Sequence, residues 1–291
     1  MNRILPPWRE KSLIAVTGIH HGLGNRVRVV LGTRVLARLE GRTFLYTWTT
    51  GKYFGCHLDD LWDFDEQVIA RSTAIALSTR FPFRDNSLDW LDAEARSQRI
   101  LQIQTPHALK LPGGERSWES ELRALQPVND IADRVRRFHS STFADEPYVG
   151  VMVRAHPNSH AMTLKESPIE WYLMRMGYIV KENPGVKFFV SADTPAALDQ
   201  ITGQIPNSFG LADKGGYNTR AGIRSSVADL YLLAGSSYVL APYYSSFPDL
   251  ARCLAGGDLP METSHSRAAY SLPYTLDSYV IDPIRPHLRT G

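Results

Sequence analysis

Three short segments of this chain carry groups that could hold an anion. Arg154 directly follows the apolar run Tyr148–Val153, and its planar guanidinium could bind two phosphate oxygens at once. Ser245 and Ser246 stand where a helix would begin, so their hydroxyls would join its first free N–H groups. Residues 22–26 (GLGNR) would let the backbone approach a ligand closely. Together these residue types suit a phosphate.

Each segment also has a simpler interpretation, which the residues alone leave open. Arg154 could form a surface ion pair, Ser246 could cap the helix, and the two glycines could form a plain tight turn. The sequence contains no GxxxxGK[ST] motif, so the usual support for ATP hydrolysis in a phosphate-loop fold is missing.

Acidic residues offer two further interpretations. Asp229 lies in an apolar helical segment, where it either faces solvent or is a buried acceptor for the N–H groups of a ligand. Asp63 and Asp65 have the DxD spacing of some metal sites. The pattern places no histidine or third carboxylate beside them, so we interpret the pair as a solvated turn and predict no metal site.

The start of the chain has the strand, turn and helix order of an α/β domain. Residues 13–17 are apolar and predict a buried strand, which a glycine-containing turn follows. Apolar side chains then recur with a period of 3.6 over residues 25–39, which predicts an amphipathic helix. Thr43–Thr47 is typical of the next strand.

A second α/β series begins at Tyr148–Val153, whose unbroken apolar run suits a parallel strand that is covered on both faces. Helices and strands are then expected to alternate: helices over residues 168–182, Pro195–Gln204, 226–234 and 248–255, and strands over residues 186–190 and 238–241. The series predicts a parallel sheet, which binds ligands beyond the carboxyl ends of its strands.

The stretch between the two series is polar and aromatic, with an Arg-rich helix at residues 130–138. We therefore predict two domains, residues 1–145 and 146–291, with the boundary near residues 143–147. The segment after Pro260 has no clear period and is expected to wrap across the surface.

Composition indicates an ordinary folded protein. Hydrophobic residues make up 43% of the chain and charged residues 21%, and the net charge is +2. This balance gives no reason to expect a nucleic-acid partner. No apolar stretch approaches the ~18 residues of a transmembrane helix. Cys56 and Cys253 belong to no paired motif, so we expect reduced cysteines and a cytoplasmic location.

Four segments, in order, resemble the motifs of the α1,6- and O-fucosyltransferase superfamily. Residues 22–48 resemble its glycine loop, helix and second strand, and residues 149–173 (VGVMVRAH to SPIEWYL) its arginine motif. Residues 188–201 (FFVSADTPAALDQI) resemble the family's strand that ends in Ala-Asp or Thr-Asp, and residues 225–256 resemble its third motif, with the helix aspartate and the pair of serines. The resemblance implies an α/β fold in which two Rossmann-like domains, each a parallel sheet flanked by helices, face each other across a cleft in a GT-B-like arrangement.

The resemblance also implies roles for individual residues. Arg154 would clamp the donor β-phosphate and stabilise the departing nucleotide. Ser245, Ser246 and the N–H of Phe247 would hold the same phosphate, and Asp229 would accept hydrogen bonds from the guanine edge. The family uses no metal, so arginine and helix N-termini would neutralise the leaving group.

The remaining donor-binding residues come from the glycine loop and from one strand end. Gly24 and Asn25 would line the cleft between the domains, and Gly22, Arg26 and Asp193 would complete the set.

The chain departs from the family around the arginine. Met152 stands in place of the family's histidine, Ala155 in place of its second arginine, and Pro157 and Asn158 where an acidic residue is expected. The catalytic base consequently stays open among three side chains of the same segment, His156, His160 and Glu166.

The resemblance implies an inverting enzyme that moves a deoxyhexose, in the first place fucose from GDP-fucose, to an acceptor hydroxyl. The nucleotide sugar would be a co-substrate, no metal or other cofactor would be needed, and the acceptor would be a glycan, a peptide or a small molecule. One alternative is the same fold with another nucleotide-sugar donor. Another is a non-catalytic nucleotide- or sugar-binding relative, which Met152 and Ala155 favour.

Overall fold

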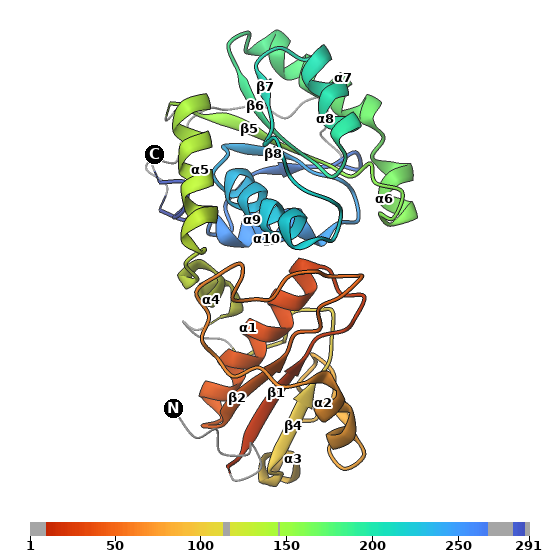
Figure 1. Cartoon of the computed structure of the whole chain (residues 1–291), viewed down its shortest axis with the longest axis vertical. Helices are drawn as coiled ribbons and strands as arrows, with labels where there is room; N and C mark the ends of the chain where they lie inside the picture. Colours follow the sequence, from red (N-terminus) through yellow and green to blue (C-terminus); the bar gives the residue numbers. More distant parts are fainter. Residues whose placement is uncertain (1–9, 113–116, 145, 267–281, 289–291) are drawn as a thin grey trace. The chain divides into compact units, whose positions relative to one another are not determined.

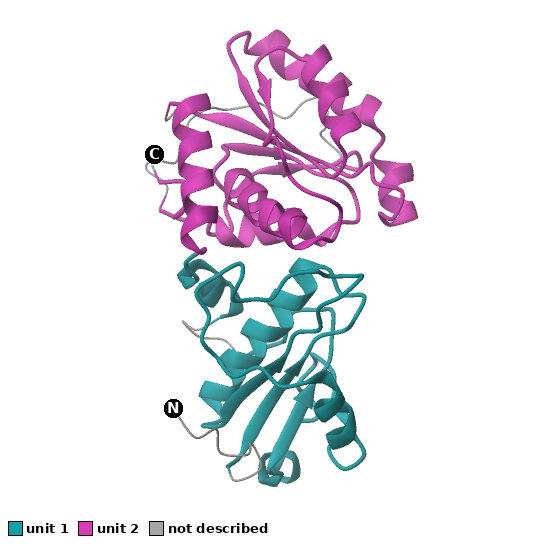
Figure 2. Ribbon diagram, in the orientation of Figure 1, with its two compact units in different colours: residues 1–126 teal, residues 127–291 magenta. Residues whose placement is uncertain are grey.

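The computed structural model describes residues 10–112, 117–144, 146–266 and 282–288 (Figure 1). The chain forms two compact units, Met1–Gln126 and Pro127–Gly291 (Figure 2).

The first unit is built on a four-stranded sheet in which every strand pair is parallel, with the order β2-β1-β4-β3. Its strands are β1 (Ser12–Val16), β2 (Thr43–Thr47), β3 (Phe83–Arg84) and β4 (Ile100–Ile103). Its helices are α1 (Leu23–Leu39), α2 (Arg71–Ser78), α3 (Ala93–Ser97) and α4 (Trp118–Ala124). All five residues of β1 are buried, because the sheet is covered on both faces.

The second unit contains a five-stranded parallel sheet with the order β7-β6-β5-β8-β9. Its strands are β5 (Tyr148–Val153), β6 (Lys187–Ala192), β7 (Ser208–Phe209), β8 (Tyr238–Leu240) and β9 (Met261–Glu262). Its helices are α5 (Asn129–Thr142), α6 (Ala161–Glu166), α7 (Ile169–Glu182), α8 (Pro195–Gln204), α9 (Arg220–Ala234) and α10 (Ser246–Leu254).

Helices cover both faces of the second sheet (Figure 1). On one face, Val149, Val151 and Val153 of β5 belong to the same buried cluster as residues of α7 and α8. On the other face lies α9, which is so close to β5 that a Cβ on Gly150 would lie 3.1 Å from Leu233 Cδ2 of the helix and 2.8 Å from Ser236 Oγ in the turn after it. Glycine therefore permits this close approach of helix and strand.

The predicted α/β class with two units of parallel sheet is confirmed. The units divide before α5, whereas the sequence suggested a boundary after it. The reason is that α5 packs on α9, where Arg134 Nη1 donates to Ser225 Oγ at 2.8 Å. The resemblance would place the acceptor in the first domain and the donor nucleotide in the second, and these two roles stay predictions.

The prediction for the segment after Pro260 is wrong at its start, because β9 is part of the sheet. Glu262 is fully buried, and its Oε1 lies 2.7 Å from Arg175 Nε of α7. Its Oε2 accepts a hydrogen bond of 2.8 Å from the Tyr238 hydroxyl. Burial alone would lower the pKa of Arg175, but the hydrogen bond and charge of Glu262 raise it overall. Residues 267–281 of this segment lie outside the described residues.

Candidate functional site

The order of strands in the second unit creates a topological switch point beside β5. The chain runs from β5 outward through β6 to β7, and then returns to place β8 on the opposite side of β5. Open parallel sheets bind ligands at such a switch point, beyond the carboxyl ends of the two diverging strands. Arg154 directly follows β5, and the loop that leads into α10 follows β8.

The Arg154 side chain is partly buried and has spare hydrogen-bonding capacity. It is 27% exposed, and its Nη1 lies 3.6 Å from Asp193 Oδ2, which is long for a hydrogen bond. Its guanidinium carbon lies 5.6 Å from the ring centroid of Phe247 in α10. Since no other described residue lies within hydrogen-bonding distance of the guanidinium, its N–H groups are available to a ligand.

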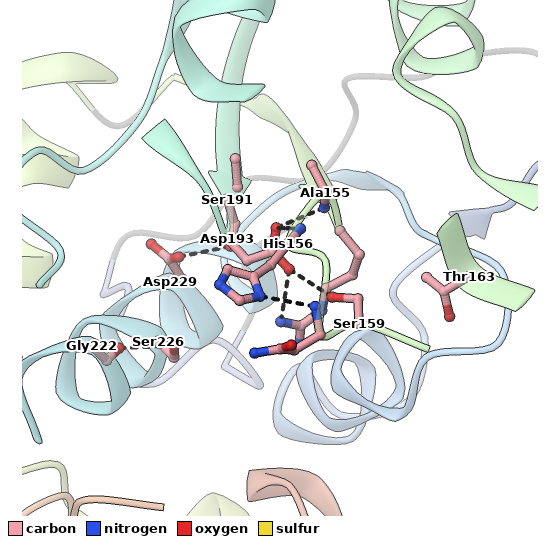
Figure 3. A network of polar contacts seen from close by, with 12 residues as sticks. Ala155, His156, Ser159, Thr163, Ser191, Asp193, Gly222, Ser226 and Asp229 are labelled. Atoms are coloured by element: carbon pink, nitrogen blue, oxygen red, sulfur yellow. Dashed lines mark hydrogen bonds and ion pairs between the residues drawn. The ribbon is translucent and has the colours of Figure 1, made fainter. Parts of the chain in front are cut away.

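Asp193 shapes the loop that carries Arg154 (Figure 3). Its Oδ1 accepts from the backbone N–H of Ala155 at 2.7 Å and of His156 at 3.0 Å, while its Oδ2 accepts from Ser159 Oγ at 3.0 Å. These contacts make Asp193 a positioning residue for the loop after β5. Its predicted contact with a donor stays a prediction.

The N-terminus of α10 is open. Ser245, not Ser246, is the N-cap residue, and its side chain makes no capping hydrogen bond. Among the described residues, neither serine hydroxyl has a hydrogen-bond partner, and both residues are only half-buried. The free hydroxyls and the first N–H groups of α10, that of buried Phe247 among them, can therefore accept an anion.

The residue before this N-terminus has a strained backbone. Tyr244 has a φ of 59°, and its side chain is mostly exposed. Its carbonyl accepts a hydrogen bond of 3.0 Å from Thr163 Oγ1 of α6, which fixes the conformation. Left-handed conformations of non-glycine residues are typical of ligand-binding loops, where they orient neighbouring groups.

Asp229 is a buried acceptor, so the solvent-facing interpretation is wrong. It is 4% exposed in α9, and its Oδ2 accepts from Ser191 Oγ at 2.7 Å (Figure 3). The same oxygen accepts from Lys214 Nζ at 2.5 Å. Its Oδ1 is buried and has no hydrogen-bond partner in the described part of the chain. An orphaned carboxylate oxygen is costly unless a donor reaches it, which makes Asp229 a candidate for binding the N–H groups of a base.

The glycine loop of the first unit presents backbone N–H groups at the start of α1. Gly22 is the N-cap residue and is exposed, Gly24 is buried, and Asn25 is half-buried. No side chain caps this helix, so its first N–H groups are open to a ligand.

Arg26 does not project a charge outward from this loop. It is fully buried, and its guanidinium donates to the carbonyls of His21 and Thr49 at 2.7 Å each and of Ile19 at 3.4 Å. Burial lowers the pKa of Arg26 to about 10. These contacts do not support the predicted donor-binding role: Arg26 ties the loop to the strand that precedes Thr49.

Two of the three candidate bases use their acceptor nitrogen within the protein. The Nδ1 atom of His156 accepts from Asn158 N at 3.1 Å, and that of His160 accepts from Met162 N at 3.2 Å. A neutral imidazole has only one acceptor nitrogen, so neither ring can take up a proton without losing its hydrogen bond.

Glu166, the third candidate, is already paired. Its carboxylate lies 2.9 Å from His265 Nε2 and 3.2 Å from Lys165 Nζ. The hydrogen bond from His265 and the contact with Lys165 lower the pKa of Glu166. A carboxylate of lowered pKa is a weak proton acceptor.

The remaining sequence predictions concern metals, cysteines and membrane segments. Asp63 and Asp65 are both exposed. Within the described ranges, no three His, Cys, Asp or Glu side chains cluster as metal ligands would. Cys56 and Cys253 form no disulfide. In the part of the chain that the structure describes, no helix has both the length and the apolar character to span a bilayer.

Several site residues carried no recognisable sequence signal. Lys214 and Ser191 contact Asp229, Tyr217 stacks on His156 at 3.9 Å between ring centroids, and His265 contacts Glu166. All four are brought to the site by segments that are distant in sequence from the residues they contact.

No protein-family model and no curated protein matches the sequence, but solved structures share the fold. The chain is similar to NodZ α-1,6-fucosyltransferase soaked with GDP-fucose, with 20% sequence identity and a TM-score of 0.58 over 84% of this chain and 92% of that one. Another structure of NodZ names Bradyrhizobium as its source. Arabidopsis thaliana FUT1, a variant in complex with GDP, is 13% identical with a TM-score of 0.58, over 87% of this chain and 70% of that one. POFUT1 in complex with GDP is 14% identical with a TM-score of 0.54, over 89% and 99%. The chain therefore has a fucosyltransferase-like GT-B fold.

Proposed function

We propose that this chain is a glycosyltransferase that takes fucose from GDP-fucose and transfers it to an acceptor hydroxyl. One observation carries the proposal. Arg154, the open N-terminus of α10 and a buried aspartate with an unpaired oxygen belong to the same switch-point region of the second sheet. The fold neighbours support it, because they were solved with GDP or GDP-fucose.

In this proposal the second unit binds the donor. Arg154 and the N–H groups of α10 hold the β-phosphate, and their positive charge and dipole stabilise the oxygen on which negative charge develops as the sugar leaves. Ser245 and Ser246 donate their free hydroxyls to the same phosphate. The unpaired oxygen of Asp229 accepts an N–H of guanine.

The donor phosphates would thus be neutralised by protein groups, without a divalent cation. The acceptor oxygen would attack the anomeric carbon from the face opposite the diphosphate, which inverts the configuration. Cys56 and Cys253 form no disulfide, which is compatible with a reducing cytosol, and we propose that location for the reaction.

A specific observation favours the non-catalytic alternative. Met152 is buried in β5, and Ala155 offers only its backbone N–H, to Asp193. If these differences removed catalysis, the chain would bind GDP but would not release it from GDP-fucose. Turnover therefore separates the two functions.

We expect the protein to release GDP slowly from GDP-fucose with water as the acceptor. EDTA should leave this rate unchanged within about twofold, which corresponds to a change of less than ~0.5 kcal/mol in the activation barrier. The reason is that Arg154 and α10 supply the positive groups that a metal would otherwise provide. Chromatographic quantitation of GDP checks the rate, with UDP- and TDP-sugars as control donors.

Two results would contradict this function. GDP binding without any GDP release would favour the non-catalytic relative. Activity that EDTA removes and Mg²⁺ or Mn²⁺ restores would contradict metal independence.

A further inference from the structure

A histidine and a carboxylate from distant segments meet beside the loop that leads into α10. Glu166 is the last residue of α6, and His265 lies in the turn that follows β9. His265 Nε2 is 2.9 Å from Glu166 Oε2, and the two side chains are 45% and 25% exposed. The pair is therefore ordered by contact yet open to solvent.

Hydrogen bonds fix the turn that carries His265. Ser264 Oγ donates to the carbonyl of Glu166, and Thr263 N donates to Ser266 Oγ at 2.9 Å. The backbone N–H of His265 donates to Thr263 Oγ1 at 3.2 Å. The turn also follows Glu262, whose buried pair with Arg175 anchors β9.

Ring stacking fixes the imidazole itself. The His265 ring lies on the Tyr243 ring, with centroids 3.9 Å apart and planes inclined by 15°. The backbone N–H of Tyr243 donates to Ser167 Oγ at 2.8 Å, which ties this loop to the residue after Glu166. Since Tyr243 is two residues before Ser245, the imidazole lies next to the loop that carries the proposed phosphate ligands.

The pairing determines which nitrogen can accept a proton. An ionised carboxylate can accept hydrogen bonds but cannot donate them. Glu166 therefore favours the form of His265 that carries its proton on Nε2, and this form leaves a lone pair on Nδ1. Among the described residues Nδ1 has no hydrogen-bond partner, whereas the Nδ1 atoms of His156 and His160 both accept backbone bonds. The adjacent carboxylate also stabilises the imidazolium that forms.

We propose that His265 is the general base of the reaction and that Glu166 is its positioning residue. This rests on the proposed transferase function. As the acceptor O–H bond breaks, its proton goes to Nδ1 of His265 and its oxygen bonds to the anomeric carbon. The bond from that carbon to the diphosphate oxygen breaks, and the electron pair leaves with GDP. The imidazolium then returns its proton to solvent.

Other titratable groups also contact this pair. Lys165 lies beside Glu166, and Tyr243 lies against the His265 ring. A protonated imidazole has no lone pair left with which to accept another proton. The rate of a reaction that uses an imidazole base therefore has an acid limb, a fall in rate toward low pH.

The test compares His265→Asn with wild type, using GDP release from GDP-fucose with water as acceptor. Asparagine keeps a polar side chain but cannot act as a base at neutral pH. We expect the rate to fall by about a hundred- to ten-thousandfold, the usual contribution of a general base. Calorimetric GDP affinity and the melting temperature should stay unchanged, and the acid limb of the rate profile should disappear.

Glu166 variants test the positioning role. Glu166→Gln should lower the rate and shift the acid limb, and Glu166→Asp should restore part of the activity. Lys165→Gln is the matched control, because it removes the other, largely exposed partner of Glu166 and should leave the rate unchanged.

The outcomes separate this proposal from the function on which it rests. A folded His265→Asn variant that keeps more than half the wild-type rate and its acid limb overturns the base assignment alone. A wild-type protein that binds GDP but releases none from GDP-fucose overturns the transferase function, and the base with it.

Discussion

Arg154→Ala should lower the rate of GDP release from GDP-fucose by about a hundred- to a thousandfold, because removing a donor aimed at a developing oxyanion costs ~2.7–4 kcal/mol. Arg154→Lys should be impaired nearly as much, since lysine offers a point charge where arginine holds two phosphate oxygens in one plane. The structure supports this expectation, because the guanidinium lies at the switch point with unused N–H groups. Steady-state rates at saturating GDP-fucose check it.

A surface arginine of the same unit is the matched control. Arg136 is 54% exposed, and its Nη1 lies 3.7 Å from Asp133, a distance close to that between Arg154 and Asp193. Such exposed pairs contribute about 0–1 kcal/mol, so Arg136→Ala should keep full activity. If folded Arg154→Ala keeps more than about a tenth of the rate, less than ~1.4 kcal/mol was lost, and Arg154 has no role in catalysis.

Glu262→Ala should destabilise the second unit by about 3–5 kcal/mol, because it leaves Arg175 as an unpaired buried charge. The Tyr238 hydroxyl would lose its acceptor in the same variant. Chemical denaturation followed by circular dichroism measures the free energy of unfolding.

A variant in which Arg175, Glu262 and Tyr238 are all replaced by apolar residues shows whether the lost stability comes from broken polar contacts or from poorer packing. The triple variant Arg175→Met, Glu262→Met, Tyr238→Phe removes every buried polar group of the cluster, so it should recover most of the stability that Glu262→Ala loses. A loss below about 1 kcal/mol in Glu262→Ala would show that the pair behaves like a surface ion pair.

The sequence was informative about the fold where strands are continuous apolar runs. The prediction for Tyr148–Val153 matches β5, because a parallel strand that is buried on both faces needs unbroken apolar sequence. The prediction for Thr43–Thr47 matches β2, whose apolar centre is Phe44–Tyr46. β4 and β9 escaped prediction for the opposite reason. Gln102 and Glu262 place polar side chains in these short buried strands, where Gln102 Nε2 donates to the carbonyl of Phe81 and Glu262 pairs with Arg175.

Some residues of the candidate site could likewise be predicted from local sequence, whereas the contacts between distant segments could not. Arg154 directly follows one predicted strand and Ser245 lies in the short loop after another, so their position at the sheet edge could be inferred from local sequence. The contact between Glu166 and His265 joins residues 99 positions apart, and the contact of Lys214 with Asp229 depends on how one loop folds back. No local pattern encodes such pairings. For Arg26, local sequence suggested a ligand contact, because the residue is charged and lies in a glycine loop. In the structure its guanidinium instead donates to the backbone carbonyls of His21 and Thr49.

Calorimetric comparison of GDP with UDP tests the central claim most directly, because nucleotide recognition in the second unit underlies every step proposed above. We predict that GDP binds at least about tenfold more tightly than UDP, a difference of ~1.4 kcal/mol, and raises the melting temperature more. Asp229→Asn should remove most of this preference, since the unpaired Oδ1 would no longer be part of a carboxylate. Equal affinities, or tighter binding of UDP, would contradict the account.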